Sequence, residues 1–415
     1  MWKNRQEERP QPERVILAGV CTGDEQDFLE SMDELEELAK TAGAVTTGRI
    51  MQLRSEMHPV TYLGTGKVEE LRDLVEEEGA DAVICDDELS PVQLRNLQSL
   101  LDCPVLDRTL LILDIFAEHA STSEGKIQDE LAQLTYRATH LSGMGKILSR
   151  QGGGIGTRGP GEKKLEIDRR RIRERISHLK QELAQVRRHR EVVRKGRADG
   201  VMAEVAIVGY TNAGKSTLLN CLTQAGVYAQ DQLFATLDPV TRGYVLPGGT
   251  QVLLTDTVGF IRKLPHSLIE AFRSTLEEAV FADLILHVVD ASSPEMEKQM
   301  HIVYETLREL GAGEKKSITL FNKQDRCPGR TRYRDAHADR IVCGSAMTGE
   351  GMDELAAQLE DLLTEHLIRI ERLYPYEQAG KEALIRKYGK IISLEYRPEG
   401  IALTALVPPE IYGNV

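Results

Sequence analysis

The sequence has 415 residues, with 52 Lys and Arg, 65 Asp and Glu, and a formal net charge of -13. A single hydrophobic core rarely extends over a chain of this length, so we expect several domains. Charged residues make up 28% of the chain and hydrophobic residues 41%, which suits a folded globular protein and excludes a wholly disordered one. An evenly spread acidic charge would also exclude general binding to nucleic acid, whose phosphates need Lys and Arg.

The charge is not evenly spread. Residues 163–197 contain fourteen Lys and Arg but only five Asp and Glu, so this segment carries +9 and the rest of the chain -22. The net charge of the whole chain therefore hides one strongly basic segment, which is a candidate for contact with an anionic partner.

The cysteines and the N-terminus indicate the compartment. The six cysteines are Cys21, Cys85, Cys103, Cys221, Cys327 and Cys343. They form no C-x-x-C pair, so we expect reduced thiols, and neither a zinc site nor a disulfide framework. Met1 to Arg14 is too charged for a signal peptide, and apolar runs such as Leu284 to Val289 are too short to span a bilayer. We expect a cytoplasmic monomer without a membrane span.

Residues 1–120 alternate short apolar runs with amphipathic stretches, which predicts a small α/β domain. Strands are expected at 15–20 and 79–85. One helix is expected to begin at Ser31, with Glu34 completing a capping box, another at Ser90 with Pro91 in its first turn, and a third over Val68 to Glu77.

The next three segments differ in pattern. Residues 121–200 predict two long antiparallel helices, a basic hairpin interrupted by the glycine-rich loop at 152–161. Residues 201–370 repeat an α/β pattern, and residues 371–415 form a short tail with expected strands at 391–396 and 401–407. The predicted architecture is thus an N-terminal α/β domain, a helical-hairpin linker, an α/β domain with a phosphate-binding loop, and a small C-terminal domain.

A phosphate-binding loop follows the buried strand at 205–208. The motif G-x-x-x-x-G-K-S and the start of the next helix comprise Gly209, Tyr210, Thr211, Asn212, Ala213, Gly214, Lys215, Ser216 and Thr217. Backbone N–H groups in such a loop cradle phosphates, the lysine reaches the β- and γ-phosphates, and the serine hydroxyl binds Mg²⁺. The spacing therefore predicts a nucleoside triphosphate site.

Two further segments are expected to surround the terminal phosphate. Asp256, Thr257, Val258 and Gly259 form D-x-x-G at the end of the expected strand at 252–255, and Phe234, Ala235 and Thr236 lie between this motif and the phosphate loop. We predict Mg²⁺ ligands at Ser216, Thr236 and Asp256, and roles in hydrolysis for Lys215, Thr236 and Gly259.

The base is predicted by N-K-x-D after the apolar run at 318–321. Its residues are Asn322, Lys323, Gln324 and Asp325, and a last strand and turn at 341–346 includes Ser345 and Ala346. A carboxylate at Asp325 can accept from both N1–H and N2–H of guanine, and adenine offers no such pair of donors. With every motif at the end of an expected strand, the sequence predicts a site for GTP and GDP.

The stretch GGGIGTRGPGEKKLEIDRR at 152–170 resembles the HflX family of ribosome-associated GTPases, as do YLGTGK at 62–67 and LFATLDP at 233–239. The resemblance covers 14–370. It implies an N-terminal α/β domain, a helical hairpin, a P-loop GTPase domain and a small C-terminal domain. It also implies GTP hydrolysis, binding to the large ribosomal subunit, and in some members dissociation of stalled or idle ribosomes under stress.

Hydrolysis has an unusual residue at one position. Many GTPases carry Gln after D-x-x-G to orient water, whereas this chain has Phe260, so we expect slow turnover without a partner. Alternatively, Thr257 or Arg262 serves in its place. Asn212 has two interpretations, a K⁺ ligand beside the phosphates or a residue needed for turn geometry.

The basic hairpin leaves the partner open at this stage. Arginines are dense near 169–175 and 187–197, which favours rRNA bound through backbone and shape, although a solvated helix face is the alternative. The leading hypothesis is a GTPase on the large ribosomal subunit. The alternatives are an RNA-binding assembly or stability factor that uses GTP as a conformational switch without splitting ribosomes, and a tRNA- or metabolite-linked GTPase.

Overall fold

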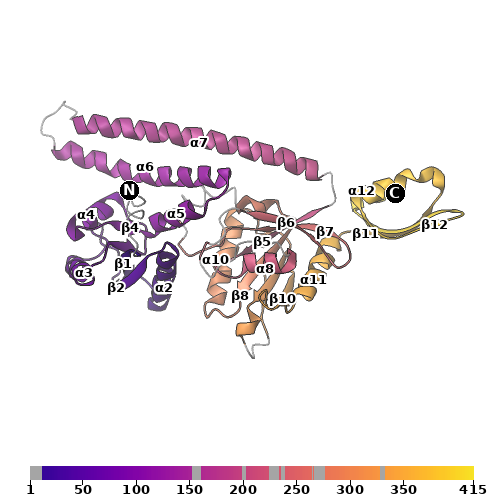
Figure 1. The fold of residues 1–415 in the computed structure, drawn as a ribbon, viewed down its shortest axis with the longest axis horizontal. Helices are drawn as coiled ribbons and strands as arrows, with labels where there is room; N and C mark the ends of the chain where they lie inside the picture. The colour runs from indigo at the N-terminus through magenta and orange to yellow at the C-terminus, as the bar shows by residue number, and fades with distance from the viewer. Residues whose placement is uncertain are drawn as a thin grey trace. The chain divides into compact units, whose positions relative to one another are not determined.

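The computed structural model describes residues 12–151, 160–198, 202–223, 233–234, 239–263, 265, 276–327 and 332–415. The chain divides into two compact units (Figure 1). The first comprises 1–185 with the short stretches 231–237 and 262–273, and the second comprises 186–230, 238–261 and 274–415. The loop predicted at 152–161 lies outside the described residues over 152–159.

The first unit is built on a four-stranded parallel sheet with the order β2-β1-β3-β4. Its strands are β1 (Arg14–Cys21), β2 (Val45–Leu53), β3 (Ala82–Cys85) and β4 (Val105–Asp107). Its helices are α2 (Glu25–Thr41), α3 (Thr65–Glu78), α4 (Pro91–Leu101) and α5 (Arg108–His119). Apolar side chains of α3 and α4 pack on one face, against alternate residues of β1 such as Ile16 and Ala18. Figure 1 shows α2 and α5 beside the same sheet.

Three helix starts were predicted in this unit, and the structure confirms one of them. Helix α4 begins as expected, because Ser90 and Gln93 form a capping box and Pro91 occupies the first turn. The predicted start at Ser31 is wrong, since Asp24 caps α2 seven residues earlier. Ser31 is instead buried inside α2, and its hydroxyl donates to Asp86 over 2.8 Å, a tertiary contact that local pattern does not reveal. The third predicted start is also late, because α3 includes Thr65, Gly66 and Lys67.

Two long helices, α6 (Ser123–Gln151) and α7 (Pro160–Ala198), form the predicted hairpin (Figure 1). Residues later in α6 contact residues earlier in α7: Glu130 pairs with Arg175, and the carbonyl of Leu141 accepts from Arg169. The helices are therefore antiparallel. Leu131 of α6 is buried against Leu179 and Leu183 of α7 where the two helices meet.

The second unit contains a six-stranded sheet with the order β10-β9-β8-β5-β7-β6, in which β6 alone pairs antiparallel. The strands are β5 (Ala203–Gly209), β6 (Val240–Val245), β7 (Gln251–Asp256), β8 (Leu284–Asp290), β9 (Ser317–Asn322) and β10 (Arg340–Cys343). The helices around it include α8 (Lys215–Thr223), α10 (Met296–Glu309) and α11 (Met352–Thr364).

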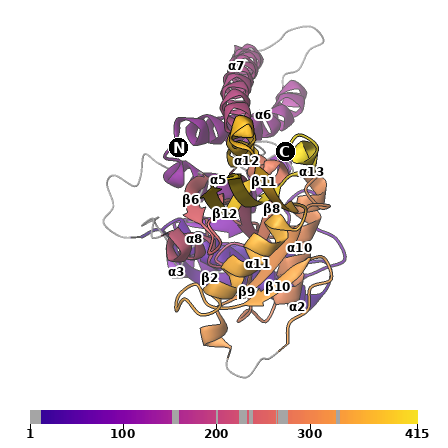
Figure 2. The same cartoon turned by 90° about the vertical axis from the view of Figure 1, so that its right-hand side faces the viewer.

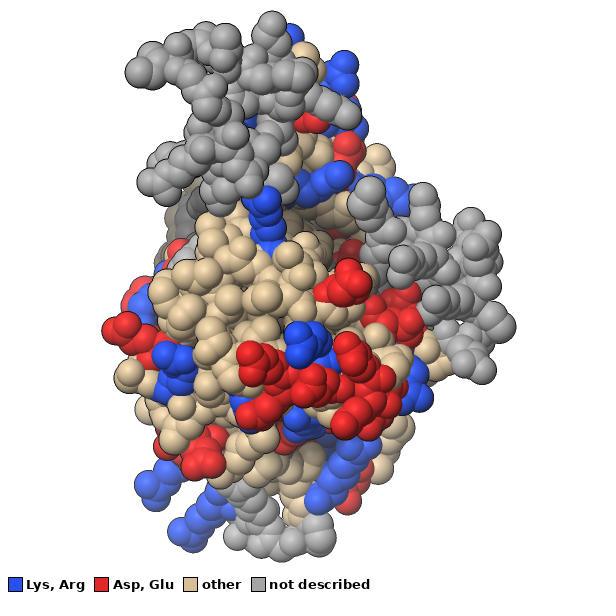
Figure 3. Space-filling view, turned by 90° about the vertical axis from the view of Figure 1, so that its left-hand side faces the viewer, with Lys and Arg blue, Asp and Glu red and all other residues tan. Residues whose placement is uncertain are grey.

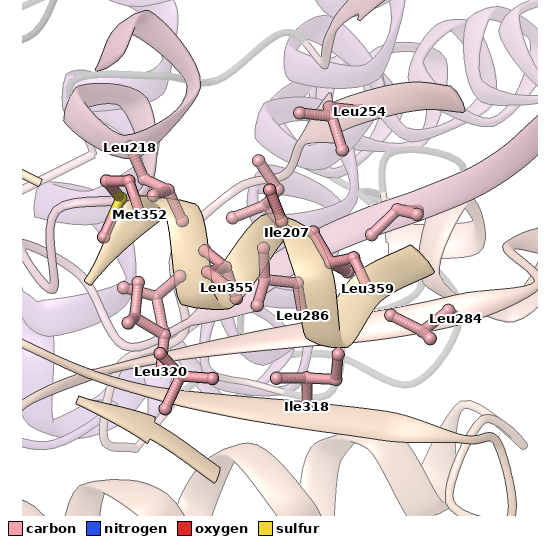
Figure 4. Close-up of a cluster of buried hydrophobic side chains, with 14 of the residues drawn as sticks. Ile207, Leu218, Leu254, Leu284, Leu286, Ile318, Leu320, Met352, Leu355 and Leu359 are labelled. Atoms are coloured by element: carbon pink, nitrogen blue, oxygen red, sulfur yellow. The ribbon is translucent and has the colours of Figure 1, made fainter. Parts of the chain in front are cut away.

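The residues that form the core of this sheet are spaced along helix and strands so that they point to the same side (Figure 4). Met352, Leu355 and Leu359 of α11 face Leu286 and Ile318 of the central strands. Helix α10 packs on the opposite face through buried side chains such as Val303 and Leu307. The continuous apolar strands are covered on both faces, as expected for a mostly parallel sheet.

The C-terminal residues form a three-stranded antiparallel sheet with the order β11-β13-β12. Its elements are β11 (Ile368–Tyr374), β12 (Lys390–Arg397), β13 (Gly400–Val407), α12 (Gly380–Tyr388) and α13 (Pro409–Tyr412). Helix α12 packs on β12 and β13, with Ile385 in the core (Figure 2). The strands expected at 391–396 and 401–407 are present, and β11 is an additional strand that begins before residue 371.

One face of the first unit carries a patch of acidic side chains (Figure 3). Figure 3 faces the side on which Figure 1 draws α3 and α4, and it shows acidic side chains gathered into a patch with a few basic ones among them. Among the helices that the structure describes, none combines the length and apolar composition needed to cross a membrane.

Candidate active site

The predicted motifs meet at one edge of the six-stranded sheet. Gly209 ends β5, Asp256 ends β7 and Asn322 ends β9, and these strands run parallel through the sheet. The turn after β10 joins them, because the backbone N–H of Ala346 donates to Asn322 over 2.9 Å. The carboxyl edge of a parallel sheet is where such folds bind ligands.

The loop between β5 and α8 is held by backbone geometry that requires glycine. Gly214 has a φ of +97°, and a Cβ there would lie 2.4 Å from the amide nitrogen of Asn322. That amide nitrogen donates to the carbonyl of Ala213 over 2.8 Å. Asn322 therefore ties the phosphate loop to the turn after β10 through its two amide atoms.

Lys215 begins α8 and is almost fully buried. Its ammonium donates to the carbonyl of Tyr210 over 2.8 Å and to that of Gly209 over 3.2 Å. Burial lowers the pKa of Lys215 to about 8, the charge of Asp256 opposes this shift, and Lys323 adds to it. An anionic ligand beside Lys215 stabilises the charged amine and so raises its pKa.

Thr211, Asn212 and Thr217 complete the described part of this loop and the start of α8. Their contacts with a nucleotide stay predictions. Thr211 is buried, its N–H donates to the carbonyl of Phe260, and Thr217 lies in the first turn of α8. Asn212 has a φ of +60°, a left-handed conformation that Asn tolerates better than most residues. This supports the turn-geometry interpretation of Asn212. The K⁺ interpretation stays a prediction, which a comparison of GTP turnover in potassium and sodium salts tests.

Two predicted Mg²⁺ ligands are adjacent. The hydroxyl of Ser216 donates to a carboxylate oxygen of Asp256 over 2.6 Å, and Asp256 is fully buried at the end of β7. A hydroxyl and a carboxylate that converge in this way are the hard oxygen donors that Mg²⁺ prefers. The donor set therefore fits Mg²⁺. The third predicted ligand, Thr236, lies outside the described residues, as does Ala235.

The D-x-x-G segment passes close to the phosphate loop. A Cβ on Gly259 would lie 2.9 Å from Nζ of Lys215, so glycine permits this approach. Val258 and Thr257 are buried, and the Thr257 hydroxyl donates to the carbonyl of Ile207 over 2.7 Å. This bond engages the hydroxyl proton of Thr257 with the backbone of β5, which disfavours Thr257 as the residue that positions water.

Phe260 and Arg262 follow this segment with different surroundings. Phe260 is fully buried with Tyr210 and Val208, and its N–H donates to the carbonyl of Gly209 over 3.1 Å. Arg262 forms an ion pair with Glu30 of α2 over 2.9 Å. Neither side chain is thus placed to orient water at Gly259, and the described part of this segment offers no replacement for the missing Gln.

The two segments expected around the terminal phosphate, at 234–236 and 256–259, are called the switch segments here. Both continue into residues that belong to the first unit. Phe234 is buried and meets the ring of Phe116 in α5 edge to face, with ring centres 4.8 Å apart. Lys263 forms ion pairs with Asp86 and Asp87, which follow β3. Sequence reasoning missed these carboxylates, although their place at the carboxyl edge of the N-terminal sheet is a signal that could have found them.

The predicted guanine-binding residues surround a single turn. Lys323 has a φ of +62°, and its ammonium lies 2.7 Å from a carboxylate oxygen of Asp290 at the end of β8. The next residues form a short 3₁₀ helix, Gln324–Arg326. Asp325 is exposed, and the buried hydroxyl of Ser345 donates to it over 2.5 Å. Sequence reasoning missed Asp290, although it directly follows the apolar run Leu284 to Val289 and ends β8.

Comparisons with known proteins agree with this arrangement. Residues 29–117, 119–197 and 204–323 match the families described as GTP-binding GTPase N-terminal, GTP-binding GTPase Middle Region and 50S ribosome-binding GTPase. The chain is 60% identical to the GTPase HflX of Lacrimispora saccharolytica, covering 97% of this chain and 95% of that one. It is 42% identical to the GTPase HflX of Escherichia coli, covering 86% and 85%.

Among solved structures, the chain is similar to a GTP-binding protein from the hyperthermophilic archaeon Sulfolobus solfataricus in complex with GDP. It has 23% sequence identity and a TM-score of 0.46, and the match covers 85% of this chain and 99% of that chain.

Proposed function

The chain belongs to the HflX family of GTPases and is a GTP hydrolase, and from this premise we propose that it acts on the large ribosomal subunit. In this proposal GTP orders the switch segments, the basic hairpin of α6 and α7 docks on rRNA, and hydrolysis permits release. The outcome is the dissociation or rescue of stalled or idle ribosomes under stress. The four-segment division, the cytoplasmic location and the monomeric state are part of the same proposal.

Residues at the carboxyl edge of the six-stranded sheet supply the chemistry. The backbone N–H groups of the phosphate loop and the ammonium of Lys215 hold the phosphates, and Gly259 presents its N–H to the γ-phosphate. Ser216 and Asp256 would hold Mg²⁺, which would supply positive charge to offset that of the β- and γ-phosphates. Asp325 accepts from the guanine edge.

The observation that carries the ribosomal partner is the surface of α7. Arg171 and Arg173 are exposed, and neither forms an ion pair with another residue in the described part of the chain. Their neighbours Arg170 and Arg175 have partners, Glu174 and Glu130. Cations that the fold leaves without carboxylates are suited to phosphates of RNA. The match of residues 204–323 to a family described as 50S ribosome-binding GTPases supports the same partner.

Charge reversal on this surface tests the proposal. We expect Arg171→Glu together with Arg173→Glu to weaken co-sedimentation with purified large subunits at least about tenfold, because two phosphate contacts are lost and two repulsions are gained. The matched control is Lys298→Glu with Arg308→Glu, an equal charge change on exposed positions of α10. Equal loss in both variants, or in neither, argues against docking through the hairpin.

The alternative is an assembly or stability factor that binds RNA and uses GTP as a conformational switch without splitting ribosomes. Light scattering of intact ribosomes distinguishes the two: GTP-dependent loss of scattering supports dissociation, and tight binding without such loss supports the alternative.

A further inference from the structure

The variable position of N-K-x-D is occupied by a residue with a defined structural contact. The amide nitrogen of Gln324 donates to the backbone carbonyl of Phe321 over 3.1 Å. The backbone N–H of Gln324 donates to the carbonyl of Gly344 over 3.2 Å, which joins the turn to the end of β10. The side chain of Gln324 is thus directed back toward β9. Its amide oxygen, Oε1, is left to accept a hydrogen bond from another residue.

The amide oxygen of Gln324 accepts a hydrogen bond from a tyrosine nine residues further along the chain. The hydroxyl of Tyr333 donates to Oε1 of Gln324 over 3.2 Å. The ring of Tyr333 stacks on the ring of Phe321, with ring centres 4.5 Å apart and an interplanar angle of 20°. Tyr333 therefore contacts the residue before the motif with its ring and the variable residue within it with its hydroxyl.

This contact acts next to the base-reading carboxylate. Gln324 and Asp325 are consecutive residues of the same 3₁₀ helix, so contacts that hold Gln324 also constrain the backbone from which the Asp325 side chain projects. The hydroxyl of Ser345 donates to one carboxylate oxygen of Asp325. The carboxylate of Asp325 is therefore constrained directly by Ser345 and, through the backbone of the 3₁₀ turn, by the contacts of Gln324.

We propose that Tyr333 is a positioning residue for guanine specificity, which acts through Gln324 to align the Asp325 carboxylate with the N1–H and N2–H donors of the base. This rests on guanine recognition by Asp325, and it does not depend on any ribosomal partner. All binding measurements are therefore made without ribosomes, so a failure of ribosome docking leaves the inference intact.

The test is the variant Tyr333→Phe in the full chain, which keeps the ring and removes only the hydroxyl. We expect the affinity for a fluorescent GDP analogue to fall about fivefold, the effect of one neutral hydrogen bond. GTP turnover at saturation should change less than about twofold, because the phosphate site is untouched. The preference for GTP over ITP, measured as the ratio of their kcat/KM values, should fall about threefold. The hypoxanthine base of ITP has no N2 amine, so a misaligned Asp325 loses a hydrogen bond that GTP makes and ITP never made.

Tyr304→Phe is the matched control. Tyr304 packs near the same core, and its hydroxyl donates to Asp335, two residues after Tyr333, rather than to the N-K-x-D turn. We expect Tyr304→Phe to lower the melting temperature and to leave GDP affinity and the GTP/ITP ratio unchanged. This control separates loss of specificity from general loosening of the segment at 332–337.

A second variant, Gln324→Ala, removes the acceptor. Because both residues act through one contact, Tyr333→Phe combined with Gln324→Ala should cost no more than Gln324→Ala alone. Three results would each overturn the proposal: an unchanged GTP/ITP ratio in Tyr333→Phe, an equal change of that ratio in Tyr304→Phe, or additive effects in the double variant.

Discussion

Phe260 occupies the position at which many GTPases place the Gln that orients water, and the structure gives it a core role. Its ring is fully buried among apolar side chains, and its backbone N–H and carbonyl bond to Gly209 and Thr211. Phe260 therefore fixes the chain directly after D-x-x-G to the core of the second unit. The sequence shows the substitution, but only the packing shows that the ring points into the core.

We therefore expect Phe260→Gln to fail as a gain of function. An amide buried in this cluster loses apolar contacts and lacks hydrogen-bond partners, so the free energy of unfolding should fall by about 3 kcal/mol. GTP turnover should not rise. Urea denaturation and single-turnover hydrolysis check this, with Phe281→Gln at a half-exposed position as the control. A faster and equally stable Phe260→Gln protein would contradict the packing argument.

His287 on β8 gives the stability a dependence on pH. Burial lowers its pKa from 6.5 to about 4, with Asp335 opposing the shift and Lys215 adding to it. Because the folded pKa lies below the unfolded one, the unfolded state binds more protons between these values. Stability contributed by the neutral ring is complete above pH 6.5 and is lost as the pH falls toward 4.

The loss due to His287 should amount to about 3 kcal/mol at the acidic end of this window. His287→Phe should therefore lose less stability than the unaltered protein when urea denaturation is moved from pH 7 to pH 5. His301→Asn, which changes an exposed histidine of α10, should follow the unaltered protein. Parallel pH curves for all three proteins would show that His287 does not cause the acid sensitivity.

Among the elements, the two switch segments differ most from what sequence motifs alone suggest. Phe234 packs on α5, Arg262 pairs with α2, and Lys263 pairs with the residues after β3. Arg262 and Lys263, the third and fourth residues after D-x-x-G, are thus paired with carboxylates of the first unit. Because only two residues separate Gly259 from Arg262, we expect these ion pairs to affect the D-x-x-G segment.

Releasing these contacts should change hydrolysis. Glu30→Gln combined with Asp87→Asn weakens the ion pairs of Arg262 and Lys263, and we expect basal GTP turnover without ribosomes to rise about fivefold as the segment gains freedom. Asp33→Asn on α2 is the control, because Asp33 pairs with Arg49 instead. Turnover that is unchanged in the double variant would mean that these pairs are structural only.

Local motifs predicted most elements around the site, and tertiary placement determined the residues that were missed. The phosphate loop, D-x-x-G and N-K-x-D lie at strand ends because their function requires it, so their spacing in the sequence was sufficient. Asp290 also lies at a strand end but belongs to no motif, and only its ion pair with Lys323 reveals its place in the site. Tyr333 lies in neither a strand nor a motif, and its contacts with Phe321 and Gln324 follow from tertiary packing. Ser31 misled for the same reason, since its hydroxyl serves Asp86 rather than a helix start.

At the scale of the whole molecule, the distribution of charge explains how a chain with a net charge of -13 can bind RNA. The acidic side chains gather on surfaces such as the one in Figure 3, where they favour solubility and oppose indiscriminate binding. The exposed arginines of α7 concentrate the basic charge on one helix. Affinity for rRNA is then expected from one element and not from the surface in general.

The most direct test of the account is GTP turnover by the full chain with and without purified large ribosomal subunits. Because no described residue after D-x-x-G is placed to orient water, we expect large subunits to raise kcat at least about tenfold, which requires only ~1.4 kcal/mol of additional transition-state stabilisation. Small subunits at the same concentration should have no effect. Equal turnover with and without large subunits would contradict the account.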